Sequence, residues 1–293
     1  MPNIDLLLSR ASVGSRANQT RSDFHVYLWP YDGIATLQPS LGAPGLAMMD
    51  YYASKGMNFC RDHYQISGGG AYIEAYIRSG VDYWAARAEA LRIDLWFLDT
   101  ETSFYTGLAV DAASDLAGAQ NAASWSKSQW ATHHGTTMYV GNYGNSTGIR
   151  TTERIGYPFN KTEKTFRDDK NNNDVNGQYV AAAWDWMGPE LYQGKIDEFT
   201  QGLDWLCNEK SRLGITTPLI PFIWRHAAPS TISTYNFMTA QLEYAYTRPE
   251  CNGLVLWGTE NAAAAPDYYD SAPWMQATLD FLAKYSIKSG TPF

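Results

Sequence analysis

Two acidic residues, Asp99 and Glu101, stand two positions apart at the end of the apolar segment Asp94-Leu-Trp-Phe-Leu-Asp-Thr-Glu101. Residues two apart in a strand face the same side, so we expect both carboxyl groups to project in one direction. Two acids crowded in a poorly hydrated, aromatic pocket cannot both ionise easily, so the pKa of one of them rises. A carboxyl group that stays protonated near neutral pH can protonate the departing oxygen of a glycosidic bond. The pair therefore predicts cleavage of a glycosidic bond.

A structural interpretation of the same pair remains open. Asp99 could cap a following helix, and Glu101 could pair with an arginine such as Arg61. An Asp-x-Glu triplet is common by chance, so its context decides between the two interpretations. Here it ends an apolar strand and precedes Thr102-Ser-Phe-Tyr105, which favours the catalytic one.

Seven short apolar runs alternate with helix-like segments along most of the chain. The expected strands are Phe24–Trp29, Met57–Cys60, Ile93–Leu98, Thr136–Asn142, Tyr179–Trp184, Leu219–Trp224 and Gly253–Trp257. The expected helices are Gly45–Lys55, Ala71–Leu91, Asp111–His133, Gly194–Leu213 and Ile232–Tyr246. Apolar strands separated by helices indicate a parallel sheet covered on both faces, and closed on itself this is an α/β fold of the (β/α) TIM-barrel type. An eighth strand is either Ile4–Leu8 or absent, in an incomplete seven-stranded barrel.

In a barrel of this type the catalytic groups lie at the C-terminal ends of the strands. The expected strand ends carry acids and aromatic rings, which together suit a sugar-binding cleft. Asp185 or Glu260 could act as a second carboxylate across the cleft. The candidate substrate-binding residues are Asp32, Tyr139, Tyr143, Trp184, Asp185, Trp224, Trp257 and Glu260.

Composition agrees with one barrel domain over residues 1–293, with 1–22 as an N-terminal extension, because such barrels often exceed 200 residues as a single unit. The 11 tryptophans and 20 tyrosines raise the aromatic content to 14%. This is more than an ordinary core requires, and the rings either line a cleft or fill the core.

Several classes of partner and site are disfavoured. The net charge of −8 and the lack of a Lys/Arg run argue against nucleic acid, and no apolar run approaches the roughly 20 residues of a membrane span. The five histidines show no metal-binding spacing and the glycines no phosphate loop, so we expect neither a metal nor a cofactor. Residues 1–11 do not resemble a signal peptide, which leaves the compartment open and is compatible with extracellular action. Whether Cys207 and Cys251 pair is also open.

The acidic segment resembles known glycosidase motifs. Residues 94–101 match three of the four fixed positions of the chitinase-type D-x-x-D-x-D-x-E strand, with Phe97 in place of an acid. The shorter Asp-x-Glu after an apolar strand looks more like the hyaluronidase family, which has an incomplete seven-stranded barrel. Residues 218–224 (PLIPFIW) and 253–258 (GLVLWG) resemble that family's last two strands, including its cleft-lining tryptophan.

This resemblance implies a role for several residues. Glu101 would be the general acid/base, and Asp99 would orient and polarise the substrate's acetamido group, whose carbonyl oxygen acts as the internal nucleophile. Tyr143 or Tyr139 would match the tyrosine after the next strand and Trp257 the tryptophan of the last strand, while Trp184 stands where the family has a tyrosine. The family's disulfides and basic cleft are absent here, which argues against hyaluronan itself as the substrate.

We therefore expect an endo-acting glycoside hydrolase whose partner is an oligosaccharide or polysaccharide. Two alternatives remain: a two-carboxylate glycosidase that uses Asp185 or Glu260 as partner, and a non-catalytic carbohydrate-binding barrel. The separation of the carboxyl groups would distinguish the enzymatic routes, since about 5 Å implies direct displacement and roughly 6.5–9.5 Å leaves room for a water.

Substitution of Glu101 tests the assignment of the general acid. We expect Glu101→Gln to keep the fold and sugar binding and to lower turnover by orders of magnitude, because the positioned proton donor is lost. The measurement is hydrolysis of a substrate with a poor leaving group. More than roughly a tenth of the wild-type rate in the variant would contradict the assignment.

Overall fold

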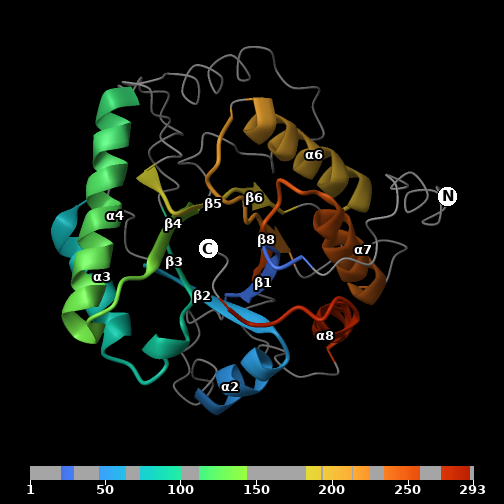
Figure 1. Ribbon diagram of the computed structural model, residues 1–293, viewed down its shortest axis with the longest axis horizontal. Helices are drawn as coiled ribbons and strands as arrows, with labels where there is room; N and C mark the ends of the chain where they lie inside the picture. The colour runs from blue at the N-terminus through green and yellow to red at the C-terminus, as the bar shows by residue number, and fades with distance from the viewer. Residues whose placement is uncertain are drawn as a thin grey trace.

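The computed structural model describes residues 21–29, 46–63, 73–99, 112–143, 183–192, 194–212, 214–224, 234–257 and 272–290 (Figure 1). The possible strand Ile4–Leu8 lies outside these residues, as do the candidate site residues Asp32, Glu101 and Glu260. None of the described helices is long and apolar enough to cross a membrane.

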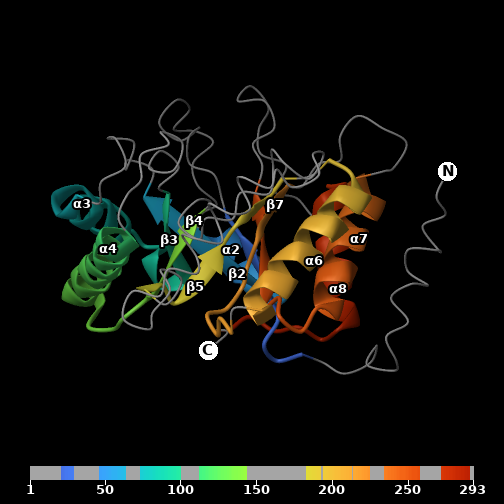
Figure 2. The same ribbon diagram turned by 90° about the horizontal axis from the view of Figure 1, so that it is seen from above.

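Parallel strands and helices alternate along the chain. The strands are β1 (His25–Leu28), β2 (Met57–His63), β3 (Leu95–Asp99), β4 (Tyr139–Tyr143), β5 (Trp186–Gly188), β6 (Glu190–Leu191), β7 (Phe222–Trp224) and β8 (Gly253–Trp257). The helices are α2 (Leu46–Ser54), α3 (Glu74–Ala85), a short 3₁₀ turn at Ala90–Arg92, α4 (Ala112–His134), α6 (Ile196–Arg212), α7 (Thr234–Thr247) and α8 (Pro273–Lys284). In Figures 1 and 2 the helices surround the strands, with α3 and α4 on one side and α6, α7 and α8 on the other.

The strands form one parallel sheet in the order β5-β4-β3-β2-β1-β8-β7-β6. The two ends of this order, β5 and β6, are separated in the chain only by Pro189, which lacks the N–H needed to continue a ladder. The backbone N–H of Ile220 donates to the carbonyl of Met187, and that of Phe222 to the carbonyl of Pro189, each at 2.9 Å. The stretch 186–191 therefore occupies one strand position between β4 and β7. The sheet closes into a barrel of seven described strand positions, which confirms the predicted fold.

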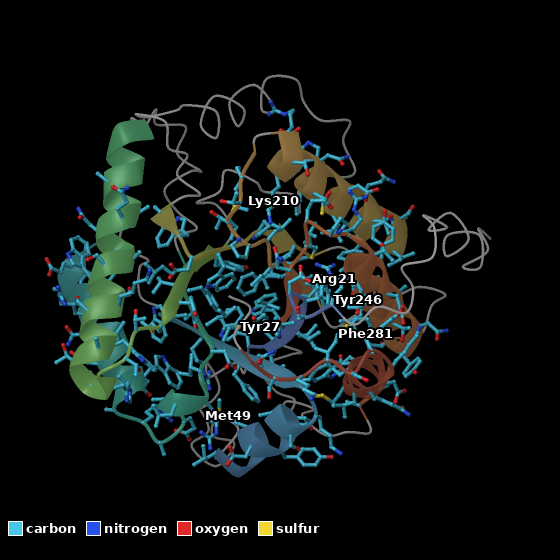
Figure 3. All side chains as sticks on the ribbon, viewed as in Figure 1. Arg21, Tyr27, Met49, Lys210, Tyr246 and Phe281 are labelled. Carbon is cyan, nitrogen blue, oxygen red and sulfur yellow. The ribbon has the colours of Figure 1, made fainter. Side chains whose placement is uncertain are left out.

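Alternation along each strand divides the apolar side chains between the barrel interior and the outer layer. In β3, Leu95 and Phe97 face the interior, while Trp96 and Leu98 pack outward against α3 and α4. The buried interior cluster consists of Tyr27, Trp29, Cys60, Leu95, Phe97, Tyr143, Trp186, Ile220, Phe222 and Val255. On the side of the barrel away from α3 and α4, Figure 3 shows Tyr246 of α7 and Phe281 of α8 outside the sheet. Both belong to a second buried apolar cluster between the helices and the sheet.

Two glycines leave the space that the largest interior ring occupies. A Cβ atom at Gly141 would overlap the indole of Trp186, and one at Gly188 would overlap the rings of Phe222 and Trp186. The indole N–H of Trp186 donates to the carbonyl of Trp96 at 3.2 Å, which satisfies its polar group inside an apolar cluster. The barrel interior is therefore a packed core of rings.

Several element boundaries expected from the sequence differ from the structure. Of the strand expected at 179–184, residues 179–182 lie outside the described part. Its expected end at Trp184 was wrong, because β5 begins at Trp186 and the strand continues past Pro189. β2 extends to His63, three residues beyond the expected end, and α8 was not predicted. All three cysteines are buried free thiols, so Cys207 and Cys251 do not pair, and burial raises the pKa of Cys251 to about 11.

The end of the expected N-terminal extension is joined to the barrel. The guanidinium group of Arg21 donates hydrogen bonds to the carbonyls of Tyr246, Arg248 and Cys251, at 3.0, 2.9 and 2.8 Å. Arg21 thereby ties the start of β1 to the end of α7 and to the segment that enters β8, as the labels in Figure 3 indicate.

The seating of Trp186 predicts the effect of adding one methyl group. We expect Gly141→Ala to lower the free energy of unfolding by about 1–3 kcal/mol, because the added carbon overpacks the barrel interior. Gly290→Ala is the matched control: its Cβ would meet no atom within 4 Å, so we expect a change within about 0.5 kcal/mol. Denaturant titration of both variants measures the difference, and equal stabilities would contradict the packing argument.

Candidate functional site

Aromatic side chains gather where the strands end. Trp29 follows β1, Trp224 and Trp257 are the last residues of β7 and β8, Tyr143 is the last residue of β4, and Tyr192 follows β6. Because all neighbouring strands are parallel, these positions lie at the same end of the barrel. We call this end the mouth, and it is the end at which barrel enzymes place their chemistry.

Four of these rings form a continuous stack. Trp29 and Trp257 have ring centroids 5.7 Å apart and planes inclined by 25°; for Trp257 and Tyr192 the values are 4.7 Å and 24°, and for Tyr192 and Trp224 they are 5.9 Å and 18°. We call these four residues the ring stack. Trp29 is its buried end and Trp224, 40% exposed, its outer end. Trp257 lies inside the stack, so a ligand meets its edge, whereas Trp224 can offer the face of its ring.

The floor of the mouth is made of rings that pack edge to face. Phe97 has centroid distances of 5.0 Å to Trp29 and 4.9 Å to Phe222, with interplanar angles of 87° and 70°. Phe97 is fully buried. An acid at this position would be desolvated among aromatic rings, which gives a physical reason for the departure from the chitinase-type motif.

Two hydrogen bonds involve the aromatic residues at the mouth. The hydroxyl of Tyr192 donates to the hydroxyl of Tyr143 at 2.7 Å. The indole N–H of Trp29 donates to Oδ1 of Asp62 at 3.2 Å. The indole nitrogen of Trp257 is buried without an acceptor among the described residues.

The strand ends expected from the sequence include Trp29 and Asp62, but neither was among the candidate substrate-binding residues, and Tyr192 was missed altogether. The signal for Asp62 was its place two residues after Cys60, which alternation puts on the interior face once β2 is extended to His63. Tyr192 was hidden by the misplaced strand before Trp186, since no strand was expected to end near residue 191.

Of the two predicted catalytic acids, the structure describes only the backbone of Asp99. This residue ends β3 and pairs in register with Tyr143 of β4, which places its backbone at the mouth. Its side chain lies outside the described part, as does the whole of Glu101. Of the two candidate tyrosines, Tyr143 is at the mouth, while Tyr139 begins β4 and lies at the opposite end of the barrel interior.

Trp184 and Asp185 lie away from the mouth because they precede β5. Trp184, 3% exposed, packs in the outer layer near α3 and α4. Oδ2 of Asp185 accepts the backbone N–H of Val140 at 2.8 Å, and Oδ1 accepts from Nζ of Lys127 at 2.7 Å. The expectation that these two residues wall the cleft rested on the wrong strand position and is corrected here.

Asp94, the first acid of the motif, also lies at the far end of the barrel. Its Oδ2 accepts the backbone N–H of Phe59 at 2.8 Å just before β3 begins. Burial raises the pKa of Asp94 to about 6, although the bond from Phe59 and the charge of Arg92 act in the opposite direction. Asp94 thus joins β3 to β2 and does not reach the mouth.

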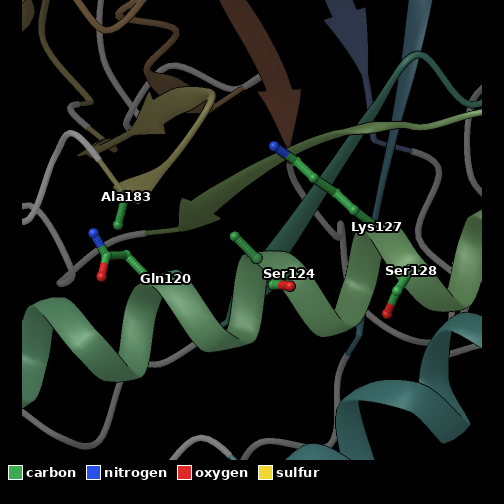
Figure 4. Close-up of a pocket in the computed structure, with 6 residues that line it drawn as sticks. Gln120, Ser124, Lys127, Ser128 and Ala183 are labelled. Atoms are coloured by element: carbon green, nitrogen blue, oxygen red, sulfur yellow. The ribbon is translucent and has the colours of Figure 1, made fainter.

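A shallow hollow on the outside of the barrel, shown in Figure 4, is lined by α4 and Ala183. Its lining residues are Gln120, Ala123, Ser124, Lys127, Ser128 and Ala183. Lys127, its one charged side chain, is already paired with Asp185. Among the residues that the structure describes, no group of three or more His, Cys, Asp or Glu side chains could hold a metal ion.

The ring stack predicts different outcomes for its inner and outer tryptophans. We expect Trp224→Ala to weaken sugar binding about tenfold with little loss of stability, because the removed ring is exposed at the rim. Trp257→Ala removes a ring from inside the stack, so we expect it to cost about 3–5 kcal/mol of stability as well. Thermal melts paired with oligosaccharide titrations measure both effects, and Trp224→Phe is the control that keeps a ring. A large loss of stability in Trp224→Ala with unchanged binding would contradict this description.

No protein-family model matches the chain, and no curated protein matches its sequence. Among solved structures, the chain is similar to bee venom hyaluronidase, with a TM-score of 0.45, 12% identity and coverage of 90% of this chain and 98% of that one. It is also similar to a GH128 exo-beta-1,3-glucanase from Aureobasidium namibiae, with a TM-score of 0.42, 11% identity and coverage of 92% of this chain and 98% of that one. A third similar structure is a triple mutant of an endo-beta-1,4-glucanase from Xanthomonas axonopodis pv. citri. Its TM-score is 0.41 at 12% identity, and the match covers 91% of this chain and 100% of that one. These likenesses concern the barrel and assign no role to any residue here.

Proposed function

We propose that this protein is an endo-acting glycoside hydrolase that cleaves a polysaccharide or glycan at the barrel mouth. The observation that carries the proposal is the ring stack, which stands at the same end of the barrel as Asp99, the last residue of β3. Flat apolar rings with polar atoms at their edges suit the C–H faces and hydroxyl groups of a sugar. Asp99 ends β3, and Glu101 follows two residues later in the sequence.

The backbone of β3 supports the placement of the two acids. Leu95 and Phe97 face the barrel interior, so the alternation of a strand predicts the same face for Asp99. If the chain stays extended for two more residues, Glu101 follows on that face, further out at the rim. In that arrangement the rings of the mouth would limit its hydration, and a poorly hydrated carboxyl group keeps its proton to higher pH. Glu101 is then suited to be the general acid/base, with Asp99 assisting.

The shape of the ring stack and the charge of the chain bear on the substrate. Trp224 stands at the rim with its ring partly exposed. One part of a long polysaccharide can pack on this ring while another part lies near the acids. This favours cleavage within a chain. The net charge of −8 disfavours a strongly anionic polymer, so the substrate class we propose is a neutral glycan.

Substrate-assisted retention is the mechanism we propose for Asp99 and Glu101. The acetamido oxygen of a 2-acetamido sugar attacks the anomeric carbon while Asp99 holds the acetamido N–H. The glycosidic C–O bond breaks as Glu101 transfers its proton to the leaving oxygen. Water then opens the cyclised intermediate and returns a proton to Glu101. The alternative uses an enzyme carboxylate as nucleophile, and because Asp185 lies at the far end of the barrel, Glu260 is the remaining partner.

A thiazoline analogue of the 2-acetamido sugar tests this mechanism, because it copies the cyclised intermediate and should bind far more tightly than the substrate. We expect strong inhibition, and we expect Glu260→Gln to keep the wild-type turnover. An inert thiazoline together with a covalent adduct on Glu260, trapped with a fluorinated sugar, would overturn the mechanism and support the two-carboxylate route. A wild-type protein that binds oligosaccharides but hydrolyses none of them would instead show a non-catalytic carbohydrate-binding barrel.

A further inference from the structure

A buried carboxylate at the mouth has no part in the reaction described above. Asp62 lies on the interior side of β2, two residues after Cys60, and pairs in register with Phe97 of β3. It is 7% exposed. Placing a carboxylate among aromatic rings is costly unless hydrogen bonds compensate for the lost water, and an apolar residue of similar size would be more stable there. The position therefore calls for a role beyond stability.

One contact of Asp62 is with the buried end of the ring stack. Its Oδ1 accepts the indole N–H of Trp29 at 3.2 Å, across the neighbouring strands β1 and β2. A carboxyl oxygen can accept a hydrogen bond whether the group is ionised or protonated. The bond therefore contributes to the direction in which the edge of the Trp29 indole points.

Three independent constraints meet at Trp29. Its backbone N–H donates to the carbonyl of Leu256 on β8 at 3.3 Å, which holds the main chain. Its ring faces Trp257 in the stack and meets Phe97 edge to face. The bond to Asp62 supplies the remaining constraint, on the direction of the indole edge. Because the rings stack in sequence, the orientation of Trp29 is passed on to Trp257.

We propose that Asp62 is a positioning residue of the sugar site: by accepting the Trp29 indole N–H, it sets the orientation of the ring stack beside the catalytic acids. This inference rests on the proposed function. It assigns Asp62 no contact with the reacting atoms, and its effect on the substrate passes through Trp29 and Trp257. An acceptor of the same geometry, charged or neutral, should therefore serve nearly as well.

A double-mutant cycle tests the proposal. We expect Asp62→Leu and Trp29→Phe each to lower kcat/KM about tenfold, mainly through KM, and the double variant to lower it by about the same factor, because both changes remove one bond. We expect Asp62→Asn, whose amide oxygen can still accept from the indole, to stay within about threefold of wild type. Asp94→Asn is the control, a partly buried acid at the far end of the barrel, and should leave kcat/KM unchanged. Losses that multiply to about a hundredfold in the double variant, or an Asp62→Asn as impaired as Asp62→Leu, would overturn the inference.

A readout without activity separates this inference from the proposed function. The ¹⁵N–¹H signal of the Trp29 indole is identified by its absence in Trp29→Phe. We expect it to move in Asp62→Leu, or in Asp62→Ala if the leucine variant does not fold, and to stay in place in Asp62→Asn. An unmoved signal in the variants without an acceptor overturns the inference. If the signal moves as expected but the wild-type protein hydrolyses no glycan, the proposed function fails, and the same cycle measured on oligosaccharide dissociation constants then decides the positioning role.

Discussion

The seating of one indole, that of Trp186, in the space left by Gly141 and Gly188 holds the barrel together. Its ring stacks on Phe222 with centroids 6.0 Å apart and meets Phe97 edge to face, while its N–H donates to the carbonyl of Trp96. Through these contacts β3, β4, β5 and β7 share one packed interior. A core filled in this way resists a change of even one methylene group, which makes it a rigid base for whatever stands above it.

The mouth is the next layer of that same packing. Four strands each contribute an interior residue and, two positions later, a residue at the mouth, because side chains in a strand alternate between the faces. The pairs are Tyr27 and Trp29, Cys60 and Asp62, Phe222 and Trp224, and Val255 and Trp257. Rings in the lower layer exclude water from below, so a ligand approaches only from the strand ends. Aromatic content above the ordinary level is thus divided between the core and a surface suited to sugar.

The acids at the two ends of the barrel perform different tasks. Asp94 and Asp185 each precede a strand, and each accepts a backbone N–H from the strand beside it, Phe59 of β2 or Val140 of β4. These two acids therefore stabilise the pairing of neighbouring strands. Asp62, at the other end, accepts from a side chain, the indole of Trp29, and orients a ring. Position along the strand, rather than residue type, separates structural acids from candidate functional ones.

The sequence by itself determined the barrel, because apolar runs alternating with helical segments have few other ways to bury both faces of a parallel sheet. It also placed Trp224 and Trp257 at strand ends, since both directly follow clear apolar runs. The position of the fifth strand was decided only by the tertiary structure: Pro189 breaks its pattern, and pairing with β4 and β7 supplies the hydrogen bonds that local sequence cannot indicate. For the same reason Trp184 and Asp185 were misplaced and Tyr192 was missed. The bond between Trp29 and Asp62 joins residues 33 positions apart, and only the closed barrel brings them together.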